Sequence, residues 1–257
     1  MHLAASERLV PLLLVRASSP STNAELAALA GSEPPPPFTV LVTDDQTAGR
    51  GRLGRTWVAP AGSALAISVL LAPRIPPERF GWLPVAAAVA MTRALTPVLP
   101  AQSAVSFKWP NDVLVGGRKV CGVLAELLPG AAAAVVGAGV NLAMTADQLP
   151  VDSATSVAVE GGDPDPDTVL SGYLAALRDL VESYEAADGD AERSGLADAA
   201  RAACATLGRE VRVELPGGEL LEGRAVAMDA DARLIVRAAG GSDRTVAAGD
   251  VTHARLA

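Results

Sequence analysis

Three arginines alternate with three glycines in one short polar segment of the 257-residue chain. This segment, Asp44–Trp57, reads DDQTAGRGRLGRTW, with arginine at positions 50, 52 and 55. Glycine keeps backbone N–H groups accessible, and a guanidinium group binds carboxylates and phosphates through paired hydrogen bonds, so the segment is suited to wrap an anion. It lacks the GK[ST] of a P-loop and the GxGxxG of a dinucleotide fold. Solvated loops and nucleic-acid-binding tails share this composition and remain alternatives.

Cationic residues elsewhere in the chain are almost all arginine. Of 21 basic residues, 19 are arginine, and only Lys108 and Lys119 are lysine. We interpret these two as positions that need a compact ammonium group, with chance placement as the alternative. The two histidines, His2 and His253, stand near the ends of the chain, which argues against a histidine triad, a histidine base or a histidine metal site.

Composition excludes several functional classes. The net charge of −8 argues against a general nucleic-acid binder, because phosphate contacts need a basic surface. Two cysteines, Cys121 and Cys204, cannot form a disulfide framework, so a reduced cytoplasmic protein is expected. The apolar run Leu9–Val15 is too short to span a bilayer and lacks the basic start of a signal peptide. We expect it to form a buried strand.

The rest of the chain must supply the elements that position these residues. The spacing Thr22-Asn23-Ala24-Glu25 is that of a capping box and predicts a helix from Asn23 to Ala30. Apolar periodicity predicts strands at 38–44 and 63–71, an Ala-rich helix at 78–98, short strands from 105 to 144, and helices at 167–187 and 191–207. From Arg209 onward, short alternating strands with turns predict a small β-barrel after an α+β domain.

The Gly/Arg segment and four further motifs resemble biotin protein ligases, the enzymes that attach biotin to carboxylase carrier domains. In family order the motifs are STN (21–23), GRGRLGRTW (49–57), KWPND (108–112), KVCG (119–122) leading to Glu126, and GAGVN (137–141). The resemblance implies an α+β fold with a mixed β-sheet and helices in a biotin/lipoate ligase-like catalytic core, residues 1–207. It also implies a small C-terminal SH3-like β-barrel, residues 208–257.

The resemblance implies a reaction in two steps. The biotin carboxylate attacks the ATP α-phosphate to give biotinyl-5′-AMP and pyrophosphate, and a lysine of a biotin carboxyl carrier domain, from acyl-CoA or pyruvate carboxylases, then attacks that anhydride. ATP and biotin are the substrates, and Mg²⁺ accompanies ATP. The first step brings two anions together, so it needs positioned cations more than a proton shuttle. A site without histidine fits this requirement.

The resemblance also implies roles for individual residues. Lys119 and Arg52 are the expected catalytic cations, and no residue is expected to hold a metal. The residues expected to bind biotin are Ser21, Thr22, Asn23, Gln46, Gly49, Arg50, Gly51, Arg52, Lys119 and Gly122. The residues expected to bind ATP are Arg52, Arg55, Trp57, Asn111, Asp112, Lys119 and Asn141.

Several of these residues have a second interpretation. Trp57 either stacks on adenine or packs in the core, and Thr22 either caps a helix or contacts biotin. Asp112 either orients Lys119 or binds Mg²⁺ through water. Lys108 either supports the site from its wall or is an ordinary surface lysine. Cys121 lies in a strand pattern and is expected to be a core residue rather than a nucleophile.

Other functions remain open at this point. A lipoate or octanoate transferase of the same superfamily and a non-catalytic biotin sensor are the alternatives. Only 20 residues precede Ser21, too few for a helix-turn-helix domain, so a monofunctional ligase is expected. The expected partners are biotin, ATP and the carrier domain, with no nucleic acid and no membrane, and the protein is expected to be a monomer or a ligand-dependent homodimer.

Overall fold

A computed structural model describes residues 1–130, 132–215, 218–247 and 250–253. The elements in chain order are α1 (Ala4–Glu7), β1 (Leu13–Val15), α2 (Thr22–Ser32), β2 (Val40–Thr43), β3 (Gly49–Arg50), η1 (Arg52–Gly54), β4 (Thr56–Trp57), β5 (Ala64–Leu71), η2 (Pro77–Gly81), α3 (Trp82–Leu95), η3 (Thr96–Val98), β6 (Val105–Lys108), β7 (Asp112–Val115), β8 (Arg118–Leu127), β9 (Ala134–Asn141), η4 (Ala146–Gln148), α4 (Pro166–Ala186), α5 (Leu196–Ala203), β10 (Glu210–Glu214), β11 (Leu220–Met228), β12 (Leu234–Arg237), β13 (Asp243–Val246) and β14 (Asp250–His253).

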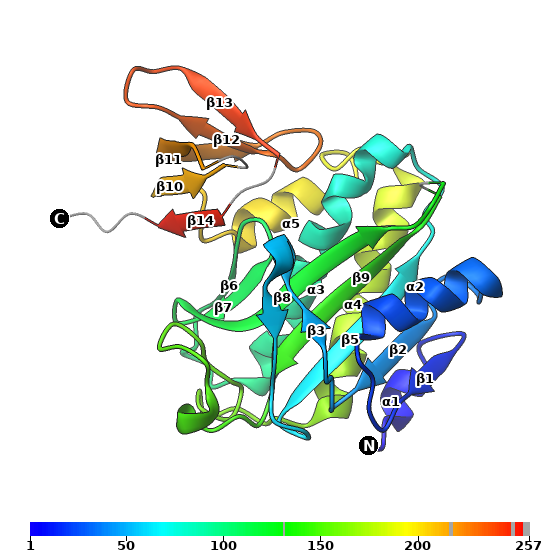
Figure 1. The fold of residues 1–257 in the computed structure, drawn as a ribbon. Helices are drawn as coiled ribbons and strands as arrows, with labels where there is room; N and C mark the ends of the chain where they lie inside the picture. The colour runs from blue at the N-terminus through cyan, green and yellow to red at the C-terminus, as the bar shows by residue number, and fades with distance from the viewer. Residues whose placement is uncertain (131, 216–217, 248–249, 254–257) are drawn as a thin grey trace.

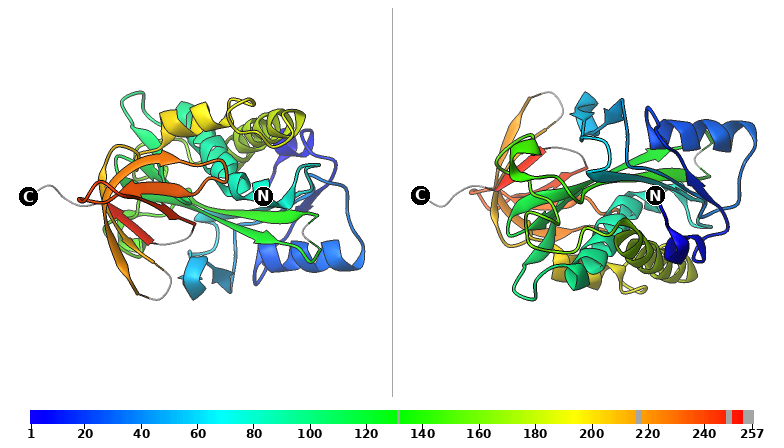
Figure 2. Two further views of the ribbon diagram at one scale, coloured as in Figure 1. Left: turned by 90° about the horizontal axis from the view of Figure 1, so that it is seen from above. Right: turned by 90° about the horizontal axis from the view of Figure 1, so that it is seen from below.

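Seven strands form one mixed sheet in the order β1-β2-β5-β9-β8-β7-β6. β1 runs parallel to β2, and the other neighbouring pairs are antiparallel. The central strand β5 is buried at all eight positions, because elements cover both faces of the sheet (Figure 2). The predicted α+β class with a mixed sheet and helices is confirmed.

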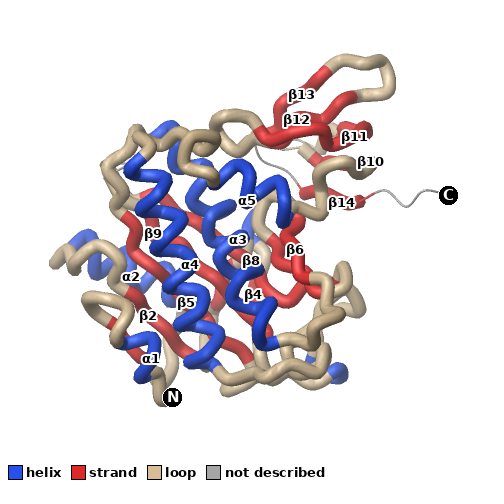
Figure 3. The backbone as a smooth tube through the Cα atoms, turned by 180° about the vertical axis from the view of Figure 1, so that it is seen from behind, coloured by secondary structure: helices blue, strands red, loops and turns tan. Residues whose placement is uncertain are grey.

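Two layers cover the sheet. Helices α3, α4 and α5 lie on one face, and α2 with the β3–β4 segment lies on the other (Figures 1 and 3). The Ala-rich helix α3 is buried around almost its whole circumference, between the sheet and α4, as expected of a helix that is apolar on all sides. Small side chains let α4 approach closely, since a Cβ atom at Gly172 would lie 3.5 Å from the Cβ of Ala94. No helix of the described residues is long and apolar enough to cross a membrane.

Helix α2 begins one residue earlier than the capping-box spacing predicts. Its N-cap is Ser21, whose hydroxyl accepts a hydrogen bond from the Ala24 N–H at 3.4 Å. The predicted pairing of Thr22 with Glu25 was wrong, because the Glu25 carboxylate instead accepts a hydrogen bond from the Ser19 hydroxyl at 2.9 Å. Thr22 is therefore free of the capping role and lies buried in the cavity described below.

The C-terminal strands form a separate antiparallel sheet in the order β13-β12-β11-β10-β14. Among the described residues no ladder joins the two edge strands, β13 and β14, so an antiparallel sheet is shown and the closed SH3-like barrel stays a prediction.

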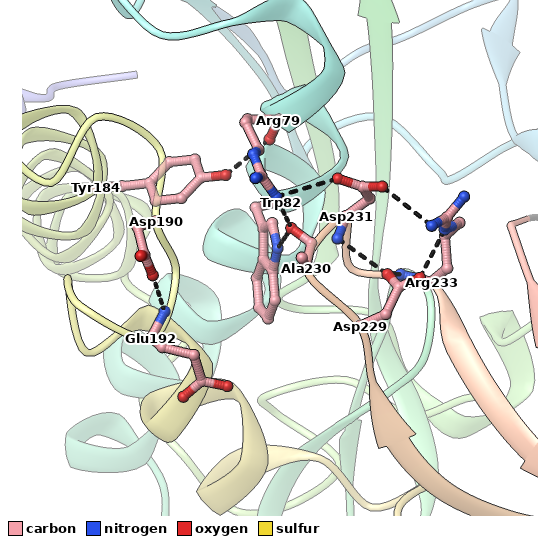
Figure 4. A network of polar contacts seen from close by, with 9 residues as sticks. All are labelled: Arg79, Trp82, Tyr184, Asp190, Glu192, Asp229, Ala230, Asp231 and Arg233. Atoms are coloured by element: carbon pink, nitrogen blue, oxygen red, sulfur yellow. Dashed lines mark hydrogen bonds and ion pairs between the residues drawn. The ribbon is translucent and has the colours of Figure 1, made fainter.

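One turn of this sheet, between β11 and β12, attaches it to the core (Figure 4). The indole N–H of Trp82 and the Arg79 guanidinium both donate to the Ala230 carbonyl at 2.9 Å. The indole N–H of Trp109 donates to the Ala232 carbonyl, also at 2.9 Å. Because Trp109 belongs to the KWPND motif, the C-terminal sheet supports the loop that carries several predicted site residues.

Candidate active site

A cavity opens on the face of the sheet that carries α2 and the β3–β4 segment. Most of the residues predicted from the sequence line it together: Ser21, Thr22, Asn23, Gln46, Arg50, Gly51, Arg52, Arg55, Trp57, Asn111, Asp112, Lys119 and Gly122. Segments separated by about 100 residues thus meet at one place, while the roles predicted for the individual residues stay predictions.

A bulge in β8 turns Lys119 toward this cavity. Cys121 pairs with Val113 of β7, but Lys119 pairs with Leu114, so β8 carries one extra residue between the two pairs. Side chains alternate between faces in a regular strand, and Lys119 would then share a face with Cys121. With the bulge, Cys121 lies in the helix-covered core while Lys119 lines the cavity beside Gly122.

Asp112 lies between the only two lysines of the chain. Its Oδ1 is 2.5 Å from Lys119 Nζ, and its Oδ2 is 3.5 Å from Lys108 Nζ. These contacts favour the interpretation that Asp112 orients Lys119. Both carboxylate oxygens thus face ammonium groups, and whether Asp112 also binds Mg²⁺ through water stays a prediction.

Cys121 is not a nucleophile in this arrangement. Burial raises the pKa of its thiol to about 12, although the nearby Lys119 ammonium acts in the opposite direction. A thiol with this pKa is protonated at neutral pH, and only the thiolate reacts readily. The expectation of a core residue agrees with this position.

The Gly/Arg segment folds as a small hairpin. Gly49 and Arg50 of β3 pair with Trp57 and Thr56 of β4, and a single 3₁₀ turn connects the two strands. The hairpin lies next to the KWPND loop, because the Arg52 guanidinium donates to Asn111 Oδ1 at 3.1 Å. These contacts hold arginines over the same cavity that Lys119 lines.

Two glycines make room for the Trp57 side chain and its strand. A Cβ atom at Gly139 would lie 2.8 Å from Trp57 Cε2, so the indole packs directly on the backbone of β9. A Cβ atom at Gly49 would lie 2.5 Å from the Trp57 carbonyl oxygen and from Gln46 Nε2. Gly49 is therefore a packing position outside the lining residues, and its predicted contact with biotin stays a prediction.

Asn23 is held by a network of polar atoms at the floor of the cavity. Its Nδ2 donates to the Leu124 carbonyl at 3.1 Å and to Glu126 Oε2 at 2.7 Å, and its Oδ1 lies 2.6 Å from the buried Ser68 hydroxyl. Both amide hydrogens are used inside the protein. Asn23 can therefore offer a ligand only acceptor capacity.

Gln46 offers a hydrogen-bond donor, which complements the acceptor of Asn23. Its Oε1 accepts hydrogen bonds from the Thr22 N–H at 2.9 Å and the Thr22 hydroxyl at 3.1 Å. Because Oε1 is occupied, Nε2 is the atom that remains for other partners. Together, Asn23 and Gln46 offer an acceptor and a donor, which suits an uncharged polar ring.

The pairing of β8 with β9 places the neutral polar groups around Asn23 close to the cations around Lys119. Gly139 pairs with Gly122, near Lys119, and Gly137 pairs with Leu124, near Asn23. The two pairs are separated by two residues along each strand, or about 7 Å. The cavity therefore offers neutral polar groups and cations about 7 Å apart along β9.

Sequence reasoning missed two residues of this network. Ser68 touches Thr22 Oγ1 at 2.8 Å as well as Asn23, and Glu126 Oε1 lies 3.4 Å from Arg50 Nη2. A lone hydroxyl in the apolar run Ala64–Leu71 was the available signal for Ser68. Glu126 ended a motif, but its partners come from α2 and β3, which local sequence does not reveal.

Asn141 lies outside the lining residues. Its amide donates to the Thr155 carbonyl at 2.9 Å and is buried. Thr155 also donates its backbone N–H to the Lys119 carbonyl at 2.8 Å. Asn141 thus fixes the segment that packs on the Lys119 backbone, and its predicted contact with ATP stays a prediction.

Two family models match the chain. Residues 15–142 match the biotin/lipoate A/B protein ligase family, and residues 206–253 match the biotin protein ligase C terminal domain. The biotin–[acetyl-CoA-carboxylase] ligase of Mycobacterium tuberculosis is 36% identical over 245 residues, which are 94% of this chain and 88% of the relative.

Solved structures give the same result. The biotin protein ligase of Aquifex aeolicus in complex with biotin and ATP is similar with a TM-score of 0.75 and 25% identity, over 96% of this chain and 100% of that one. The biotin protein ligase of Leishmania major in complex with biotinyl-5-AMP has a TM-score of 0.63 and 25% identity, over 93% and 99% of the two chains. The chain belongs to the biotin/lipoate A/B protein ligase family, among its biotin protein ligases.

Proposed function

We propose that the chain is an ATP-dependent ligase that activates biotin as biotinyl-5′-AMP and transfers the biotinyl group to a lysine of a carrier domain. The observation that carries this function is the cavity itself, which joins Lys119 and the arginine hairpin to the neutral groups of Asn23 and Gln46. Biotin has a neutral polar ring at one end and a carboxylate at the other. The relatives named above are biotin ligases, and one is described with both substrates bound.

The first step needs cations rather than a base. A biotin carboxylate oxygen attacks the α-phosphorus of ATP, the bond from that phosphorus to the bridging oxygen breaks, and pyrophosphate leaves without any proton transfer. Lys119 and Arg52 neutralise the two anions as they meet, and this electrostatic stabilisation acts on charge that develops in the transition state. Lys119→Ala should abolish or greatly slow this step while the fold remains intact.

The second step uses the anhydride. The amine nitrogen of the carrier lysine attacks the biotinyl carbonyl carbon, the bond to the phosphate oxygen breaks, AMP leaves, and one amine proton passes to solvent. The Gly/Arg hairpin closes over the intermediate and excludes water until the carrier arrives. The hydrogen bond from Arg52 to Asn111 holds the hairpin beside the cavity over which it would close.

The finer features of the proposal follow the family resemblance. The carrier is a biotin carboxyl carrier domain of an acyl-CoA or pyruvate carboxylase, and Mg²⁺ enters bound to ATP as part of the substrate. The protein acts in the cytoplasm, as a monomer or a ligand-dependent homodimer, without binding nucleic acid or membranes. Its C-terminal sheet closes as an SH3-like barrel.

The proposal is tested by exchange of labelled pyrophosphate into ATP. We expect exchange that requires biotin and does not occur with lipoate or octanoate. Exchange with lipoate or octanoate alone would favour the lipoate or octanoate transferase. Absence of exchange, with biotin binding still measured by calorimetry, would favour a biotin sensor.

A further inference from the structure

We propose that Lys108 is a positioning residue for adenylation: it holds Asp112 in place while the Lys119 ammonium moves from that carboxylate to the substrate anions. This inference rests on the proposed function and deepens it. Lys108 acts through Asp112 and is not itself placed against the substrates.

Each oxygen of the Asp112 carboxylate faces the ammonium group of a different lysine. Lys108 and Asp112 are directly opposite each other across β6 and β7, with Nζ 3.5 Å from Oδ2. Lys119 occupies the other oxygen, Oδ1, at 2.5 Å. The side chains of Asp112 and Lys108 are 16% and 28% exposed and that of Lys119 is 43% exposed, so water screens the contact of Asp112 with Lys108 only in part.

The substrates compete with Asp112 for Lys119. A biotin carboxylate and a triphosphate each attract the Lys119 ammonium, but its departure would leave Asp112 without that counterion. An uncompensated charge in a poorly hydrated site is costly, so a carboxylate with a single partner would retain that partner. Lys108 remains on Oδ2 and supplies the counter-charge that lets Lys119 leave.

The different positions of the two lysines fit different tasks. Lys119 adjoins the β-bulge and lines the cavity, whereas Lys108 belongs to a regular ladder and is absent from the lining residues. Because Lys108 is held in a regular ladder, it can stay in place as the counterion of Asp112. The Lys119 side chain is 43% exposed and lines the cavity, so it can turn toward a ligand bound there.

The test compares steady-state exchange of labelled pyrophosphate into ATP, which reports formation of biotinyl-AMP from biotin and MgATP, by the full-length protein and its Lys108 variants. We expect Lys108→Met to lower kcat about tenfold while the KM for biotin stays within about twofold. Lys108 acts through Asp112 on the movement of the Lys119 ammonium and not on binding of the biotin ring. Lys108→Arg, which restores the charge, should return kcat to within about threefold of wild type. Arg212→Met, which removes an ion-paired cation of β10 far from the cavity, is the matched control.

A double-mutant cycle shows whether Lys108 acts through Asp112. In an Asp112→Asn background, Lys108→Met should change kcat less than about twofold, because the charge that Lys108 compensates is gone. Circular dichroism and thermal melting confirm that each variant is folded, and Lys108→Gln replaces Lys108→Met if the latter does not fold.

Three results would overturn the inference. The first is an unchanged kcat in Lys108→Met, and the second is an equal loss in Lys108→Met and Lys108→Arg. The third is a full loss that persists in the Asp112→Asn background. If the wild-type protein forms no biotinyl-AMP, the proposed function fails and this inference fails with it, whereas an active wild type with an unaffected Lys108→Met overturns the inference alone.

Discussion

Gly137 of β9 lies directly beneath the amide of Asn23, and the two residues pack so closely that no side chain fits between them. A Cβ atom at Gly137 would lie 2.9 Å from Asn23 Cγ and would overlap Oδ1. The orientation of Asn23 therefore depends on a position without a side chain.

We expect Gly137→Ala to displace Asn23 and to weaken biotin binding. The shifted amide would lose its bonds to Ser68 and Glu126, so calorimetry should show a Kd for biotin raised about tenfold, with about 1–3 kcal/mol of stability lost to overpacking. Gly31→Ala is the matched control, because nothing lies within 4 Å of a Cβ atom at this α2 position. An unchanged Kd in Gly137→Ala would remove Asn23 from the biotin site.

The hairpin over the cavity should become more protected when the substrates bind. Its links to the rest of the protein include the 3.1 Å bond from Arg52 to Asn111 and the 3.4 Å contact of Arg50 with Glu126. We expect amide hydrogen exchange across 49–55 to slow about tenfold on addition of biotin and MgATP, because closure adds ligand contacts. Exchange in the core of α4 serves as the internal control. If the hairpin exchanged at the same rate with and without ligands, its proposed closing role would fail.

Acid should weaken the turn that joins the C-terminal sheet to the core (Figure 4). Burial acts to raise the pKa of Asp229, but hydrogen bonds from the backbone of Arg233 and Asp231 and from the Arg233 guanidinium outweigh it and hold that pKa below its ordinary value. A depressed carboxyl pKa contributes stability above the ordinary carboxyl pKa, and this contribution is lost as pH falls through the lower, folded value.

The corresponding variant is Asp229→Ala. We expect it to lower the free energy of unfolding at pH 7 by about 2 kcal/mol, and by less near pH 3, since that pH lies below the ordinary carboxyl pKa and part of the contribution is then lost. Urea unfolding at both pH values measures the difference. Asp198→Ala is the control, because the Asp198 side chain is 78% exposed and its ion pair should contribute less than about 0.5 kcal/mol. A loss that is the same at both pH values would contradict the assignment.

Both thiols should resist alkylation in the folded protein. Burial raises the pKa of Cys121 to about 12 and also raises that of Cys204. Because iodoacetamide reacts with the thiolate, we expect no modification at pH 8 in native buffer and two modifications per chain in denaturant, read by intact mass. Rapid labelling of the native protein, with loss of adenylation, would show that a thiolate is accessible in or near the site.

The sequence predicted the order of the elements better than the contacts between them. Alternation and periodicity are local signals, so the strand at 63–71 and the helix at 167–187 agree closely with β5 and α4. The start of α2 was misplaced because Glu25 has a partner, Ser19, that the capping-box pattern does not consider. Closure of the C-terminal sheet depends on pairing between distant strands, which turn signals alone do not determine.

In the candidate site, too, the sequence predicted individual residues better than the contacts between them. Motif resemblance identified Lys119, but regular alternation would have placed it on the core face with Cys121, and only the pairing of β8 with β7 reveals the bulge. The two lysines were noted for their rarity, yet their meeting at Asp112 depends on three strands coming together. Ser68 was missed because its role depends on α2 packing over β5.

The most direct test of ligase function is the intact mass of an apo biotin carboxyl carrier domain after incubation with this protein, MgATP and biotin, with lipoate in a parallel reaction. We predict a gain of one biotinyl group in the biotin reaction only, and no gain with Lys119→Ala. A gain with lipoate alone, or no gain with either acid under conditions in which biotin binds, would contradict the assignment of this chain as a biotin ligase.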